Sequence, residues 1–501
     1  SGTNPNYAEE PLRFGRTVEG VSPSSGLFAN TQTGSLGNGG NIQINSANLS
    51  INNGAGIGIN SNGQGSAGRF LNINARDEIS LANSSITSSL GSQAIGQGGE
   101  INLTASSLSL TNNSQITAQS AGKGNAGNIN INGNTFDAVS GGKLQTTTFG
   151  SGNAGNINLN IGDRITISGS DPNYNQRIQG TFDNQGATSG IFANTASSST
   201  GNGGNITIEP LQNRFPTIAI SDGGEVTVAS QGQGQGGEIS ITGNTLTLDR
   251  GIINASTQSG DGGNINLRLR NFIRLRNESL ISANARGEQG GDGGNITINT
   301  PFIVAFPQNN DITANAVSGS GGRVTTNATR FGIIPRTRAD LNRLGVPGLN
   351  PRNLSTSDIT AFSEQNSNFG DNLQLTSPDV DPSRGLVELP ETVTDTTQKI
   401  AQSPCRQGIG NEFAVTGRGG LPTTPNEILS SNNVRVDLLQ PVASSGNSPS
   451  ATIKPATTVT ARRVPAQGWI FNDKGQVVLT AYDPTNAGSQ RPFSTTACPA
   501  R

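Results

Sequence analysis

Residue types that carry out catalysis are sparse in this chain, and histidine, the commonest general base and metal ligand, is absent from its 501 residues. Lys plus Arg number 32 and Asp plus Glu number 34, which gives a net charge of −2. This balance excludes a basic nucleic-acid-binding surface as the main feature of the protein. The densest groups of charge are Asp163-Arg164, Asp222 with Glu225, and a row of arginines at Arg268, Arg270, Arg274 and Arg276.

Enzymes that cleave polysaccharides need Asp, Glu, Arg or Lys side chains clustered on one face. The arginine row alternates with leucine and isoleucine, which is typical of a strand with its arginines in solvent rather than of a substrate groove. Residues 260–263 and 291–294 both read GDGG and resemble calcium-binding loops, but the strict tandem pattern of such loops is missing. We therefore expect no enzymatic activity, no cofactor and no bound metal. The alternative is a carbohydrate-active lyase or hydrolase, which would need a groove with two or more carboxylates within reach of one another.

Polar and aromatic side chains offer a second kind of chemistry, the binding of a surface ligand. Asn205, Asn264 and Asn295 recur at one position of a repeated phrase. A regular array of this kind would bind a glycan or ice, but we favour an internal asparagine ladder that hydrogen-bonds the backbone at a corner of the chain. Two loops carry the candidate contact residues Tyr7, Phe14, Tyr174, Arg177 and Phe182. These side chains contact a glycan or another protomer if the loops protrude, or else they fold back onto the rest of the molecule.

A glycine-rich phrase that occurs ten times must set the architecture that positions these residues. The phrase is Gly-x-Gly/Ala-Gly, then Asn, Glu or Arg, then alternating apolar residues, as in GNAGNINI from Gly124. Successive copies start 26–33 residues apart, with one interval of 49. The copies begin at Gly37, Gly65, Gly96, Gly124, Gly152, Gly201, Gly234, Gly260, Gly291 and Gly319.

Each repeat contains three short segments in which apolar and small polar residues alternate, such as residues 101–103, 108–110 and 116–118. Alternation predicts strands with one buried face, and the Asn, Ser and Gly between them predict tight corners. Hydrophobic residues make up 31% of the chain and aromatic residues 4%, which indicates a thin, repeated core. The sequence thus predicts an all-β fold, a right-handed parallel β-helix with coils of about 28 residues and three short sheets. Ten coils at about 4.8 Å each make a rod of roughly 48 Å.

The repeat pattern also predicts the division of the chain. The 49-residue interval holds residues 168–174 and 190–195, which resemble residues 1–7 and 26–31. We therefore expect a partial coil with a decorated loop at 1–36, and we expect upstream coils to be missing before Ser1. The β-helix repeats occupy 37–330, and the last irregular coils occupy 331–390, where residues 310–314 are echoed by 357–361. A β-rich C-terminal cap follows at 391–501, with strands at 468–471 and 476–482 joined by a hairpin turn at 472–475.

Several motifs carry a resemblance to a known family. They are the GNGGNITI units, the decorated coil with DPNY and SGIFANT, SPDVDPSRGLVELP from Ser377, TGRGGLP from Thr416 and VPAQGW from Val464. Together they resemble the large filamentous-haemagglutinin-like proteins of cyanobacteria over essentially the whole chain. The resemblance implies an exoprotein secreted by the two-partner route through an outer-membrane transporter, with an upstream domain that starts the β-helix. It also implies a role in adhesion or surface structure, outside the cell or on its surface.

Two cysteines, Cys405 and Cys498, lie in the last fifth of the chain. They are either free thiols or one disulfide, and an extracellular location favours the disulfide. No stretch approaches the roughly 18 apolar residues that span a membrane. We expect a secreted structural or adhesive rod whose partners are the transporter, surface glycans, or other copies in a head-to-tail fibre. A passive surface coat is the remaining alternative.

Overall fold

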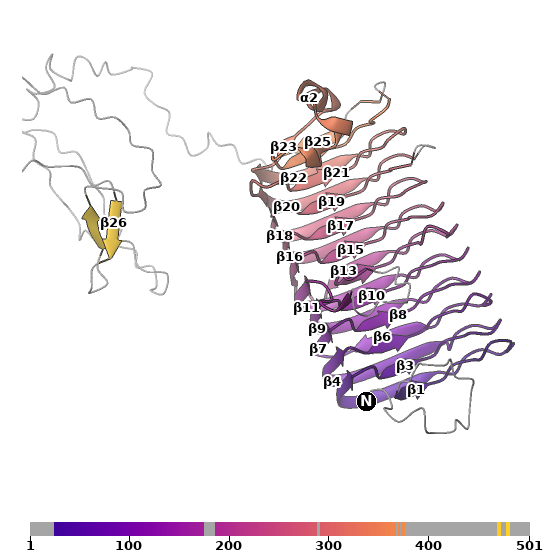
Figure 1. Cartoon of the computed structure of the whole chain (residues 1–501). Coiled ribbons are helices and arrows are strands. Elements are labelled where there is room, and N and C mark those ends of the chain that lie inside the picture. Colours follow the sequence, from indigo (N-terminus) through magenta and orange to yellow (C-terminus); the bar gives the residue numbers. More distant parts are fainter. Residues whose placement is uncertain are drawn as a thin grey trace, which may run out of the picture. The chain divides into compact units, whose positions relative to one another are not determined.

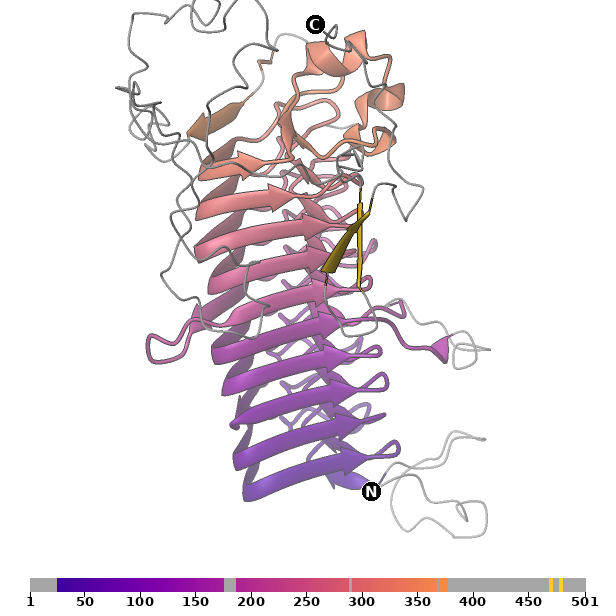
Figure 2. The same ribbon diagram turned by 90° about the vertical axis from the view of Figure 1, so that its left-hand side faces the viewer.

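The computed structural model describes residues 25–174, 186–287, 291–366, 369–370, 372–376, 468–471 and 477–480. The chain divides into two compact units, Ser1–Asp381 and Pro382–Arg501. The first unit is a parallel β-helix, which confirms the fold expected from the repeat. Figure 1 and Figure 2 show its turns stacked one on another, with equivalent strands in register.

Two long parallel sheets form the β-helix. The larger sheet contains, in order, β2 (Ile42–Asn52), β4 (Phe70–Ala82), β6 (Glu100–Thr104), β9 (Ile129–Val139), β11 (Ile157–Ser168), β13 (Ile206–Pro210), β16 (Ile239–Asp249), β18 (Ile265–Arg276), β20 (Ile296–Ala305), β22 (Val324–Phe331) and β25 (Leu373–Thr376). In two turns a separate strand continues this sheet, namely β7 (Ser107–Thr111) and β14 (Thr217–Ser221). The smaller sheet contains β1 (Gly26–Phe28), β3 (Gly56–Gly58), β5 (Ser85–Thr87), β8 (Gln115–Thr117), β10 (Lys143–Gln145), β12 (Gly190–Phe192), β15 (Glu225–Thr227), β17 (Ile252–Asn254), β19 (Leu280–Ser282), β21 (Asp311–Thr313), β24 (Asp358–Thr360) and β23 (Ile334–Pro335).

The number of sheets differs from the three that we expected. The first two segments of each turn belong to one sheet and usually to one strand, which a register shift bends, as between Ile161 and Arg164. Such a β-bulge bends a strand without ending its pairing. The true corner lies before the smaller sheet, where residues such as Asn53, Asn83 and Asn112 have positive φ. Beyond the smaller sheet, single-residue bridges such as Ser61 to Leu90 continue the parallel pairing.

Columns of aliphatic side chains fill the inside of the β-helix. Ile73, Leu103 and Ile131 stack in the larger sheet, and Ile116 and Leu144 stack opposite them in the smaller one. All five are fully buried or nearly so. Complete burial of one such side chain stabilises the fold by about 1.5–3 kcal/mol. The core is therefore narrow, but it extends without a break through the stacked turns.

The glycine phrase forms a thin out-and-back extension on each turn, visible as the paired arms stacked along the right of Figure 1. In each extension the returning arm carries the paired glycines and packs on the outgoing arm. The second glycine of the pair donates its backbone N–H to a carbonyl of the outgoing arm, as Gly204 does to Ala193 at 2.9 Å. A Cβ atom on Gly99 would lie 1.8 Å from the oxygen of Gly68 in the preceding turn. The arms of successive turns therefore stack only if glycine occupies these positions.

An irregular loop follows β23 and lies against the smaller sheet near the last turns. It contains α2 (Arg338–Arg343), η2 (Pro347–Leu349) and η3 (Pro351–Asn353), and its buried Leu341 and Val346 pack together with Phe362. In the second unit, β26 (Gly468–Phe471) and β27 (Val477–Thr480) pair antiparallel, which confirms the two strands expected there. No helix in the described part of the chain is long and apolar enough to cross a membrane.

Candidate functional site

Most of the contact residues proposed from sequence lie outside the described residues. These are Tyr7, Phe14, Arg177 and Phe182, and the same holds for the proposed disulfide partners Cys405 and Cys498. Tyr174 is described and half-buried, and its N–H donates to the carbonyl of Asp171 at 3.3 Å.

The recurring asparagines form a ladder between successive turns. The Oδ1 atom of Asn205 accepts the backbone N–H of Glu238 at 2.8 Å, and the backbone N–H of Asn205 donates to Asn156 Oδ1 at 2.9 Å. The same contact joins Asn264 to the N–H of Asn295 at 3.0 Å. The ladder bonds the backbone as we expected, but its side chains are exposed rather than internal. The space between the two arms is already occupied by small side chains of the outgoing arm, such as Ser88, whose Oγ donates to the carbonyl of Gly99 at 2.8 Å.

The aspartates of the two GDGG segments take part in a second ladder on the returning arm. Asp261 Oδ1 accepts the N–H of Asp292 at 2.9 Å, and Asp292 Oδ1 accepts the N–H of Ser320 at 2.8 Å. Each carboxylate therefore accepts a backbone N–H of the next turn, as Asn202 Oδ1 accepts the N–H of Gln235. Among the described residues, no group of three or more acidic, histidine or cysteine side chains is arranged to hold a metal ion.

A third column of amides lies on the outer face of the larger sheet. Its side chains hydrogen-bond directly to one another from turn to turn over 2.8–3.0 Å. Its members are Gln43, Asn72, Asn102, Asn130 and Asn158. We call the three columns together the amide face. Shallow grooves of about 510 Å³ and 650 Å³ lie along it over the glycine pairs.

A separate cavity of about 470 Å³ lies between the irregular loop and the outer face of the smaller sheet. Arg286, Arg352 and Glu364 provide its charges, and Asn315 and Asn350 are among its polar residues. Burial raises the pKa of the Glu364 carboxyl, and the nearby charge of Arg286 partly opposes that rise.

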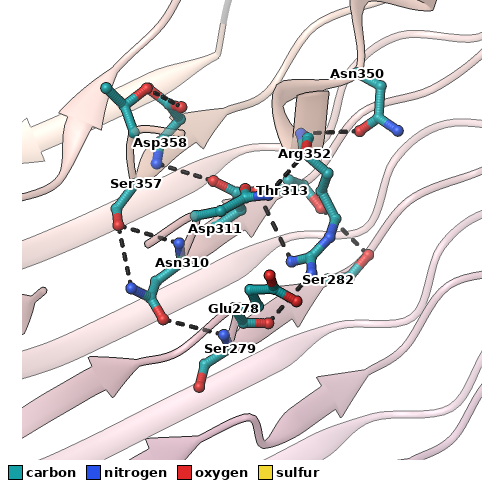
Figure 3. Close-up of polar contacts among 12 residues, drawn as sticks. Glu278, Ser279, Ser282, Asn310, Asp311, Thr313, Asn350, Arg352, Ser357 and Asp358 are labelled. Carbon is teal, nitrogen blue, oxygen red and sulfur yellow. Dashed lines mark hydrogen bonds and ion pairs between the residues drawn. The ribbon is translucent and has the colours of Figure 1, made fainter. Parts of the chain in front are cut away.

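Two fully buried carboxylates, Asp311 of β21 and Asp358 of β24, lie next to residues that line this cavity. Figure 3 shows their polar contacts. Asp358 accepts hydrogen bonds from Arg336 Nε at 2.9 Å and from Thr356 Oγ1 at 2.8 Å. Asp311 accepts the backbone N–H of Asp358 on Oδ1, and its Oδ2 lies 3.9 Å from Arg352 Nη1. Burial raises the pKa of Asp311 to about 7, although the N–H of Asp358 and the charge of Arg352 both act to lower it.

The arrangement of these groups favours a structural role. Asp311 and Asp358 occupy neighbouring rungs, but both are 0% exposed and neither lines the cavity. Glu364 is the one carboxylate among the described residues that line the cavity, so the cavity lacks the pair that a hydrolase requires. Arg336 lies at the start of the irregular loop, and its hydrogen bond to the buried Asp358 fastens that loop to the smaller sheet. The echo of residues 310–314 in 357–361 is visible in the sequence, but the contact between Asp358 and Arg336 becomes apparent only in the folded chain.

Comparison with known proteins gives no relative. No protein-family model, no curated protein and no solved structure matches the chain. The resemblance to filamentous-haemagglutinin-like proteins therefore stays an expectation from the sequence motifs.

Proposed function

We propose that this chain is a secreted protein of the cell surface or extracellular matrix, with a structural or adhesive role and no catalytic activity. The observation that carries the proposal is the amide face, which repeats exposed asparagines on turn after turn of the β-helix. A surface that repeats every 4.8 Å or so suits attachment to a polymer or a solid surface through many weak contacts. An enzyme would instead concentrate its chemistry in one place.

The amide groups retain binding capacity after the ladder has formed. In Asn205, Asn264 and Asn295 the side-chain oxygen accepts a backbone N–H from the next turn. Within the described residues, the Nδ2 groups of these three side chains form no hydrogen bond, so their donors face solvent. These asparagines lie on the returning arm directly before β13, β18 and β20, and side chains held in place by the ladder lose little conformational entropy when a hydroxyl-rich surface binds.

The location of the chain, outside or inside the cell, tests this proposal. Intact cells of the native source would be treated with a protease, and the released peptides would be identified by mass spectrometry against an intracellular marker protein. We expect peptides of the β-helix in the released fraction or in the culture medium. Recovery of the chain only from lysed cells would contradict the proposal. Secretion through a two-partner transporter rests on the family resemblance alone.

Assembly into a fibre is part of the same proposal. The β2 strand pairs with β4 on one side, and no described strand pairs with its other edge. Such an edge is a template for pairing, and preceding residues of the chain or a second copy would satisfy it. A second copy bound head to tail would build a filament. A molar mass that rises with protein concentration in light scattering would support the fibre. A molar mass that stays at the monomer value at high concentration would contradict it.

One observation favours the alternative of a carbohydrate-active enzyme, namely the two neighbouring carboxylates Asp311 and Asp358 beside a cavity. Their complete burial opposes it, because a substrate would have to displace the irregular loop to reach them. Incubation with acidic and neutral polysaccharides decides between the two. Reducing ends or unsaturated sugars released by the wild type but not by Asp311→Asn would establish the enzyme.

A further inference from the structure

The outer face of the larger sheet changes character in the last turns. Phe272, Arg274 and Arg276 of β18 lie on this face, as do Phe302 of β20 and Phe331 of β22. Phe302 is 46% exposed and Phe331 is 51% exposed, and their ring centroids lie 6.3 Å apart. We call these five residues the aromatic–arginine patch; β18, β20 and β22 are labelled along the left of the β-helix in Figure 1.

The fold does not require these side chains. In register with Phe302 lies Thr329, and Thr245 precedes Phe272 in the same column. In register with Arg274 lies Thr247. The core beneath is filled by Ile273, Leu275 and Ile303, all of them fully buried. Because threonine suffices at equivalent positions in other turns, the exposed rings have no evident role in packing, and exposed apolar clusters of this kind mark interaction surfaces.

The charge of the patch points to an anionic partner. Among the described residues, Arg268, Arg270 and Arg274 form no ion pair, and Arg276 has one carboxylate oxygen, Asp249 Oδ2, at 3.9 Å. The Nε atom of Arg274 is buried and has no hydrogen-bond partner. A symmetric contact with a second copy would bring these arginines against one another, which costs free energy.

The position of the patch distinguishes a carbohydrate from a peptide. An extended peptide binds to a sheet through an unpaired edge or through a groove. Here the patch lies on the face of three strands whose backbone groups already pair with one another. The same strands carry Asn266, Thr297 and Asn299 on their outer face, within their first halves. These neutral donors and acceptors suit hydroxyl groups, which a sugar chain carries beside its carboxylates.

We propose that the aromatic–arginine patch binds an acidic polysaccharide of the uronate class. The rings of Phe302 and Phe331 pack against the apolar faces of the sugars, and Arg274 and Arg276 pair with the carboxylates. The proposal rests on the extracellular role argued above, since an extracellular chain meets such polymers.

The test measures binding of the full chain to polygalacturonate oligomers by calorimetry. The first comparison uses methyl-esterified oligomers, which keep the sugar faces and hydroxyls but lack the negative charge. We expect esterification to weaken binding at least tenfold, and we expect binding to the acidic oligomers to weaken as salt rises. Equal binding of the two oligomers would overturn the role of the arginines, and absence of binding to the acidic oligomers would overturn the proposal.

The second comparison uses variants that take the residue of an equivalent turn, so that the β-helix is retained. The double variant Phe302→Thr with Phe331→Thr and the single variant Arg274→Thr should each lose affinity at least tenfold while keeping the wild-type circular dichroism. The matched controls are Leu36→Thr, an exposed apolar residue elsewhere, and Arg76→Ser, an exposed arginine of another turn. These controls should bind as the wild type does, and equal losses in controls and patch variants would overturn the proposal.

Other outcomes separate a failure of the patch proposal from a failure of the extracellular role. Tighter binding of single-stranded DNA or of an acidic peptide than of polygalacturonate, measured on the same samples, would assign the patch to that other polyanion and reject the uronate class. A chain released from intact cells that fails to bind polygalacturonate would leave the extracellular role standing and refute the patch proposal. A chain found only inside cells would refute the extracellular role whatever the binding result.

Discussion

The backbone N–H of Asp358 donates a hydrogen bond of 3.0 Å to Oδ1 of Asp311, although 47 residues separate them in sequence. The contact repeats the principle of the asparagine ladder, in which the side-chain oxygen of one turn accepts the N–H of the next. It differs because both carboxylates are buried under the irregular loop, where Arg336 and Arg352 approach them. The stability of the contact between these two turns therefore depends on whether the Asp311 carboxyl is protonated.

Attachment of the irregular loop should weaken as the pH rises. Asp311 has a pKa of about 7 in the folded protein, above its ordinary value of 3.8. The folded state therefore binds the proton more tightly, so the stabilisation is complete below about pH 4 and is lost as the pH rises through 7. From pH 5 to pH 8 the loss amounts to about 2–3 kcal/mol. Hydrogen exchange of the amides in 338–354, corrected for intrinsic rates, measures it.

Asp311→Asn is the matched control for the pH effect, because asparagine keeps an acceptor for the N–H of Asp358 and cannot ionise. Exchange of the loop amides in this variant should be nearly independent of pH between 5 and 8. An unchanged pH dependence in the variant would assign the effect to another group, with Glu364 the next to test because burial also raises its pKa.

Glycine at the start of an interior phrase should be essential, whereas the same glycine in the first phrase should not. A Cβ atom on Gly124 would lie 1.6 Å from the oxygen of Gly96, while one on Gly37 would meet no atom of the described residues within 4 Å. Gly124→Ala should lower the free energy of unfolding by about 1–3 kcal/mol or more. Gly37→Ala should change it by less than about 0.5 kcal/mol. Thermal or denaturant unfolding compares the two, and equal effects would refute the stacking argument.

The ladder of the returning arm should accept a carboxylate in place of an amide but not an aliphatic side chain. Asn202 Oδ1 accepts the N–H of Gln235 at 3.0 Å, and Asp261 performs the same role two turns later. Asn202→Asp should therefore unfold close to wild type, whereas Asn202→Leu should lose about 1 kcal/mol because the N–H of Gln235 has no acceptor. Equal stability of both variants in denaturant titrations would show that solvent replaces the ladder without cost.

A disulfide between Cys405 and Cys498 remains a prediction from the sequence. It would close a long loop within the second unit and restrict its unfolded state, which stabilises a folded domain by a few kcal/mol. Mass spectrometry of unreduced, alkylated protein should find one peptide pair linked and neither thiol alkylated. Two alkylated cysteines would show that the pair is free.

The sequence determined the repeating architecture, because every turn repeats the same pattern of apolar, polar and glycine residues. Alternation of apolar residues defines the strands, and the paired glycines mark the places where backbones approach too closely for a Cβ atom. The corners also have a local signal, since Asn53, Asn83 and Asn112 adopt positive φ. These features recur at the same position of every repeat, and the repetition allowed the fold to be predicted without the structure.

Tertiary structure alone decided which side chains the fold leaves on its surface and which charges it buries. In β20 a register shift between Asn299 and Phe302 reverses the alternation, so that Ile303 points inward and Phe302 outward. A shift of one residue exchanges the two faces of a strand, and the sequence does not state where it occurs. Likewise, the raised pKa of Asp311 arises only when a loop far along the chain folds back and excludes water. Burial of this kind depends on long-range packing, which no local pattern encodes.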